Sequence, residues 1–173
     1  FCLSRGLGDV YKRQALYNAD GNPQLVATDA VLGDANPFVG DYGISKNPES
    51  FAKESYRAYF TDKQRGAVLR LSMDGLTPIS DAGMSDWFKD ELKKPQYNII
   101  GSYDNYKKDY NLTLDGGEGI LEDSYTLTFS EDVRGWTSFK SFIPESGVSM
   151  SGDYYTFKSG KCYKHHEPDP YPR

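Results

Sequence analysis

The residue types best suited to binding a metal stand close together near the C-terminal end of the sequence. Cys162, His165 and His166 fall within one short stretch, and thiolate and imidazole are ligands that zinc prefers. Adjacent residues of a strand, however, point to opposite faces of its sheet. The sequence also offers no second group of ligands that would complete a four-coordinate site. We therefore predict no metal site and no cofactor.

A second candidate for ion binding is the segment 115–123, which is rich in glycine and acidic residues. Its carboxylates, from Asp115, Glu118, Glu122 and Asp123, could offer oxygen ligands to calcium. Their order differs from that of an EF-hand loop. The pattern favours a solvated loop and leaves open whether a cation binds there.

Carboxylates could also cleave glycans, which needs two of them roughly 5–10 Å apart beside a cleft. Asp62, Asp74, Asp104 and Asp153 all fall at strand ends or in turns, where Asp is favoured because its side chain bonds to nearby backbone amides. With two histidines and no nucleophile elbow, a Ser-His-Asp site is not indicated either. We predict no catalytic residues and a protein that is not an enzyme.

Four aromatic residues are candidates for contacts with a partner: Trp87, Phe88, Trp136 and Phe139. Flat aromatic rings can stack on sugars or pack against another protein. Their spacing follows the periodicity of the elements that carry them, as the spacing of core residues also does. A core role is favoured, and an interaction surface is the alternative.

Short aromatic strands joined by polar turns are the elements that must position these residues. In chain order the predicted strands are 15–18, 24–29, 56–62, 67–75, 97–104, 109–114, 124–129, 136–142, 147–153, 154–158 and 161–165. Such strands, at roughly eight-to-twelve-residue spacing, predict a mainly β fold of antiparallel meanders. We expect a propeller-like arrangement, with a sandwich-like one as the alternative.

One short helix is predicted near 82–94, after the first clear hairpin. Met84, Trp87, Phe88 and Leu92 follow one another at three- and four-residue spacing, which is typical of one face of a helix. Asp81 is expected to cap the helix at its start. Pro95 is expected to end it.

Composition excludes two classes of partner. The formal net charge of -5 disfavours a non-specific binder of nucleic acid. The sequence has no apolar run long enough to cross a membrane, so we predict neither nucleic acid nor membrane as a partner. The 14 tyrosines against 2 tryptophans suit half-buried sheets, because the ring packs while its hydroxyl reaches water.

Eight segments of the chain carry a resemblance to a known family. They are Asn47–Phe51, Tyr59–Lys63, Gly66–Ser72, Gly75–Ser80, Gly83–Phe88, Gly101–Asp104, Gly135–Phe142 and Tyr155–Gly160. In these segments the chain resembles virion structural proteins of tailed bacteriophages, especially those of marine T4-like myoviruses of the cyanophage type. The resemblance spans roughly residues 38–166.

The resemblance implies a non-enzymatic component of the virion, from the tail, baseplate or neck. Such a protein would act through contacts with other virion proteins and by self-association. One alternative is a receptor- or glycan-binding tail module with or without hydrolase activity, and another is a bacterial surface adhesion domain. Residues 1–14 resemble a translated sequencing adapter and are interpreted as non-native. We expect residues 15–173 to be a β-rich fragment of a larger structural protein.

Overall fold

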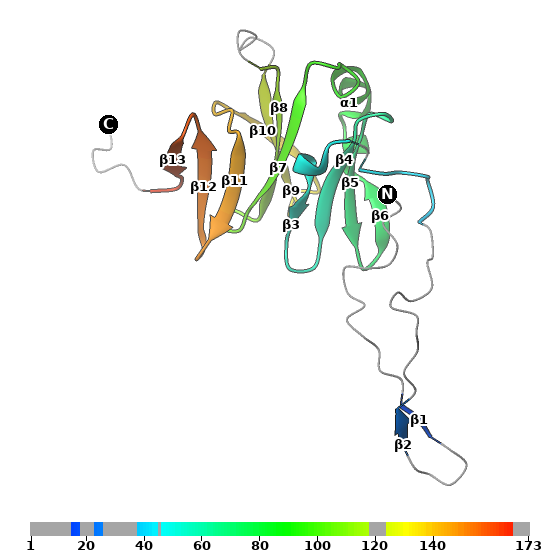
Figure 1. Cartoon of the computed structure of the whole chain (residues 1–173). Coiled ribbons are helices and arrows are strands. Elements are labelled where there is room, and N and C mark those ends of the chain that lie inside the picture. The colour runs from blue at the N-terminus through cyan, green and yellow to red at the C-terminus, as the bar shows by residue number, and fades with distance from the viewer. Residues whose placement is uncertain (1–14, 18–22, 26–37, 45, 118–123, 168–173) are drawn as a thin grey trace. The chain divides into compact units, whose positions relative to one another are not determined.

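The computed structural model describes residues 15–17, 23–25, 38–44, 46–117 and 124–167 (Figure 1). The chain divides into two compact units, Phe1–Asp41 and Tyr42–Arg173. In the first unit, β1 (Ala15–Tyr17) pairs in antiparallel fashion with β2 (Pro23–Leu25), which confirms part of the strands predicted at 15–18 and 24–29; residues 18 and 26–29 lie outside the described residues. The segment 1–14, predicted to be non-native, lies outside the described residues.

Three antiparallel sheets make up the described part of the second unit, and each is built from consecutive strands (Figure 1). The first sheet contains β3 (Ala52–Lys53), β4 (Ala58–Asp62), β5 (Ala67–Ser72) and β6 (Gly75–Pro78). The second contains β7 (Asn98–Asp104), β8 (Asp109–Asp115), β9 (Tyr125–Ser130) and β10 (Gly135–Lys140). The third contains β11 (Ser146–Met150), β12 (Asp153–Lys158) and β13 (Lys161–Lys164).

Each of these sheets is a meander, so the prediction of a mainly β fold with antiparallel meanders is confirmed. The described residues do not form a closed propeller. Closing a ring of blades takes about four or more sheets, whereas this part of the chain supplies three. No helix among the described residues is long and apolar enough to cross a membrane.

Strand β7 is the junction between the three sheets. It lies against β3, β4 and the short 3-10 helix η1 (Pro48–Ser50) on one side, and against β11 on the other. Two glycines permit this close packing. A Cβ atom on Gly101 would lie 2.1 Å from the carbonyl oxygen of Ser50, and one on Gly147 would lie 2.8 Å from Cβ of Ser102.

Stacked tyrosines form the core between the first and second sheets. The ring of Tyr59 lies 4.7 Å from that of Tyr110 and 5.7 Å from that of Tyr103, centre to centre. Tyr59 and Tyr110 are 0% exposed. The expectation that the tyrosines line half-wet sheet faces is therefore wrong for these residues. Their hydroxyls find protein partners instead, on Glu131 at 2.6 Å and on the carbonyl of Ser50 at 3.1 Å.

The helix is shorter than predicted and starts without the expected cap. Helix α1 spans Ser85–Glu91, and Met84 at its N-cap position makes no side-chain capping bond. Asp81 instead ends a separate 3-10 helix, η2 (Ile79–Asp81). The predicted apolar face is confirmed for Phe88 and Leu92, which are both fully buried.

The predicted strand at 67–75 is in fact a hairpin. Strand β5 ends at Ser72, the chain reverses, and β6 pairs back with Ser72 opposite Gly75. Strand β3 was not predicted because its two residues are too few to show an alternating pattern. The strands predicted at 97–104 and 109–114 are confirmed within a residue or two at their ends and pair as a hairpin, as are those predicted at 154–158 and 161–165.

Candidate functional site

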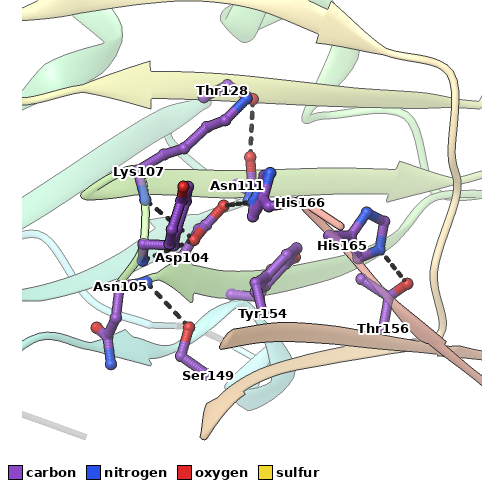
Figure 2. Close-up of polar contacts among 12 residues, drawn as sticks. Asp104, Asn105, Lys107, Asn111, Thr128, Ser149, Tyr154, Thr156, His165 and His166 are labelled. Carbon is purple, nitrogen blue, oxygen red and sulfur yellow. Dashed lines mark hydrogen bonds and ion pairs between the residues drawn. The ribbon is translucent and has the colours of Figure 1, made fainter. Parts of the chain in front are cut away.

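A polar junction joins the second sheet to the third, and we define it as Asp104, Ser149, Tyr154, His165 and His166 (Figure 2). Asp104, the last residue of β7, is 3% exposed. Its Oδ1 accepts hydrogen bonds from the amides of Tyr106 at 2.9 Å and Lys107 at 3.2 Å. Its Oδ2 lies 2.6 Å from Nε2 of His166. The same carboxylate thus shapes the β7–β8 turn and holds the chain that follows β13.

The rings of His165 and His166 both lie close to the ring of Tyr154. The ring centre of His165 lies 5.2 Å from that of Tyr154, and that of His166 lies 6.4 Å from it. Nε2 of His165 lies 2.7 Å from Oγ1 of Thr156. Burial, followed by repulsion from His166, lowers the pKa of His165. We therefore expect the ring of His165 to be neutral at neutral pH.

This arrangement corrects the expectation that the adjacent histidines point to opposite faces of a strand. Strand β13 ends at Lys164, so neither histidine belongs to it. His166 also has a positive φ of 65°, which turns the chain back toward Asp104. Cys162 lies on β13 and is exposed. Among the described residues, no group of three or more His, Cys, Asp or Glu side chains could hold a metal ion.

Strands β7 and β11 are also tied by direct hydrogen bonds within the polar junction. Oγ of Ser149 donates to the carbonyl of Tyr103 at 2.8 Å and accepts from the amide of Asn105 at 2.9 Å. Oγ of Ser102 lies 2.7 Å from the hydroxyl of Tyr154, and burial raises the pKa of that hydroxyl. The bond between Ser102 and Tyr154 satisfies two buried hydroxyls, and the contacts together fix β7 to β11 and β12.

Three of the acidic residues weighed for glycan cleavage bond to backbone amides or to cations of the chain. Asp62 accepts from the amide of Arg65 at 3.1 Å, as the turn interpretation predicts, and from the amide of Gly43 at 3.1 Å, which lies 19 residues away in the sequence. Asp104 behaves in the same way, whereas Asp153 lies 3.2 Å from the ammonium of Lys164. Asp115 lies 3.5 Å from the ammonium of Lys158. Residues 118–123 of the proposed cation loop lie outside the described residues.

The four predicted interaction aromatics come together beside helix α1. Trp87 meets Phe88 edge-on at 5.1 Å and Phe139 at 6.1 Å, while Phe88 lies 4.6 Å from Trp136. Phe88 is fully buried, and Nε1 of Trp136 donates to the carbonyl of Ile79 at 3.0 Å. Phe139 is 58% exposed. The group therefore extends from core to surface, and its role in interactions stays a prediction.

Sequence reasoning missed a cavity of about 400 Å³ between the first and second sheets. Arg57, Arg70 and Arg134 line it together with Glu131 and Asp74. Oε2 of Glu131 lies 2.8 Å from Nη1 of Arg70 and 3.7 Å from Nε of Arg57. Arg70 and Glu131 are 61 residues apart in the sequence, and no local pattern links them.

Consecutive meanders, tightly packed strands and buried polar contacts define the fold class, a β-rich protein. The family model of the Crassvirus muzzle protein matches residues 2–160 of the chain. The chain belongs to this family. It is therefore a structural component of the virion of a bacteriophage. No curated protein matches the chain.

The family match supports the coarser part of the sequence resemblance, a phage virion protein. The family it identifies is that of the crassviruses, so the match does not extend to the marine T4-like myovirus type. The matched range begins at residue 2 and thus includes most of the segment 1–14. The non-native origin of that segment stays a prediction.

Proposed function

We propose that this protein acts mechanically in the virion, as a non-enzymatic component of the tail region that works through protein–protein contacts. The observation that carries the proposal is the packing of the sheets. Strands β3, β7 and β11 are the first strands of their sheets, and β7 lies between the other two. Propeller blades pack against one another in the same serial manner. We infer a propeller-like stack that resists deformation.

Burial and hydrogen bonding support a rigid stack. Tyr59 and Tyr110 fill the space between the first two sheets, and the polar junction ties the second to the third. Close-packed interiors transmit strain because they are nearly incompressible. A protein that transmits force between neighbouring proteins in a particle needs such a rigid interior. Enzymatic catalysis does not require it.

The outer face of the third sheet supplies a surface for contacts with neighbours. Val148 pairs with Tyr155, and Phe157 pairs with both Ser146 and Cys162, so these side chains share one face. The opposite face carries Tyr154, which bonds to the second sheet. Val148 is 46% exposed and Phe157 is 38% exposed. We define Val148, Tyr155, Phe157 and Cys162 as the outer face.

We propose that this outer face, together with the exposed rim of the aromatic group at Phe139, contacts other copies of the chain or other virion proteins. Exposed apolar surface of this kind commonly marks an interaction site. Self-association of the chain is the simplest case to test.

Analytical ultracentrifugation of the purified full chain tests the proposal. We expect oligomers whose fraction rises with concentration, and we expect Val148→Glu to abolish them because a buried, unpaired carboxylate opposes association. Met73→Glu is the matched control, because Met73 is 95% exposed in the β5–β6 turn. A wild-type chain that stays monomeric at every concentration, or equal association of the two variants, would contradict self-association through this face.

A further inference from the structure

The cavity between the first and second sheets has features of a binding site that its structural role does not explain. Strands β5 and β6 form one wall, and the turn between β9 and β10 forms the other. Its volume of about 400 Å³ lies in the range of cavities that hold small ligands or a few side chains. Apolar lining comes from Ile79, Pro78 and Phe129.

The charge of the cavity is positive in a chain whose net charge is negative. Three arginines, Arg57, Arg70 and Arg134, face two acidic residues, Glu131 and Asp74. The carboxylate of Glu131 is already engaged, by Arg70 and Arg57 and by the hydroxyl of Tyr59 at 2.6 Å. Arg134 is exposed and forms no salt bridge within the described residues. One guanidinium thus remains for an anion.

Two polar atoms of the cavity wall lack a partner among the described residues. Nε of Arg70 and Oγ of Ser72 are both buried and make no hydrogen bond. They stand two residues apart on β5, so their side chains lie on the same face of the strand. Both atoms have almost no accessible surface, so a ligand in the cavity would bind to the exposed donors of the wall instead.

We propose that this cavity binds a carboxylate of an acidic peptide segment that belongs to another protein chain of the particle. A planar carboxylate matches the donor geometry of a guanidinium, and its oxygens would accept from the exposed guanidinium of Arg134. The apolar wall would take a hydrocarbon side chain next to that carboxylate. This inference rests on the proposed function, because it names the chemistry of one of the protein–protein contacts proposed there.

The balance of charges selects a carboxylate over a phosphate. Glu131 and Asp74 offset two of the three arginines, so the cavity has a formal surplus of a single positive charge. A monoanion neutralises that surplus. A phosphate group near neutral pH carries more negative charge, and the acidic residues of the wall would repel the excess.

Fluorescence anisotropy on the full chain tests the inference with a fluorescein-labelled peptide of alternating aspartate and leucine. We expect saturable binding, and no binding of the peptide in which asparagine replaces each aspartate. Arg134→Asn should weaken binding by about tenfold, as the loss of a hydrogen bond to a charged group does. Ser72→Ala should leave the affinity unchanged, because the hydroxyl that it removes is covered by the fold and cannot reach the peptide.

Lys108→Asn is the matched control for Arg134→Asn. Both residues are exposed cations in turns, with positive φ angles of 59° and 54° respectively, and asparagine suits that backbone conformation in each case. Lys108 does not line the cavity, so its substitution should leave the affinity unchanged.

Three results would overturn the inference. One is equal binding of the aspartate and asparagine peptides, and a second is equal affinity of the Arg134→Asn and Lys108→Asn variants. The third is loss of self-association in the Arg134→Asn variant. That result would mean that the cavity binds a segment of a second copy of this chain and not a segment of another protein. If the peptide fails to bind while the chain still self-associates, this inference is wrong and the proposed function stands. The Val148→Glu variant tests the proposed function alone, because Val148 does not line the cavity.

Discussion

At the scale of single residues, the side chains that could have done chemistry are used to hold the structure together. The carboxylate of Asp104 accepts from a backbone amide of the β7–β8 turn and contacts His166. The carboxylate of Glu131 contacts two arginines and accepts from the hydroxyl of a buried tyrosine. The sequence predicts the first of these roles, because Asp at a strand end commonly bonds to backbone amides. It cannot predict the second, because Glu131 meets Tyr59 across 72 residues.

His165 should make the stability of the protein depend on pH. Burial lowers its pKa below the ordinary value of 6.5, so the unfolded chain binds more protons than the folded chain as the pH falls through that value. The free energy of unfolding should therefore decrease as the pH drops below about 6.5. Replacing the residue, as in His165→Asn, should reduce that decrease.

Urea denaturation of both proteins at a series of pH values measures the effect. The informative quantity is the difference between wild type and variant, since other groups titrate in both proteins. If that difference is constant from pH 7 to pH 5, His165 is not buried in its neutral form and the account of the polar junction is incorrect.

At the scale of elements, the long alternating strands are predictable, whereas the short strands β3 and β6 are not. Strands β7 and β8 appear in the sequence as two alternating runs around a Lys-rich turn, and their pairing follows directly. Strands β3 and β6 form only because neighbouring strands offer them hydrogen bonds. Asp81 illustrates a related error, because this good capping residue ends a 3-10 helix four residues before α1 begins at Ser85.

Close approach between elements makes Gly101 sensitive to substitution. A methyl group at this position would overlap the backbone of η1, so Gly101→Ala should destabilise the fold by about 3 kcal/mol or more, at the upper end of the range for overpacking. Gly135→Ala is the control, because the nearest atom to its added methyl group lies 3.9 Å away. Chemical denaturation should show the large loss only for Gly101→Ala, and similar losses for both would contradict the packing described for β7.

At the scale of the whole molecule, consecutive meanders explain why the fold class is predictable while the closure of the fold is not. Each sheet pairs strands that are neighbours in sequence, and local pairing leaves a readable pattern of turns. The packing of one sheet on the next depends on contacts such as those of Gly101 and Gly147, which no periodicity reveals. The arginine-lined cavity depends on the same packing and was missed for the same reason.

The central claim is that the third sheet contacts a neighbour in the virion through its outer face. Cys162 lies on that face, opposite Phe157, and is exposed in the isolated chain. It therefore serves as a native probe whose reactivity with a maleimide can be followed by mass spectrometry. We predict rapid labelling of Cys162 in the isolated chain and strong protection in intact virions. Equal rates of labelling in the two samples would contradict the claim.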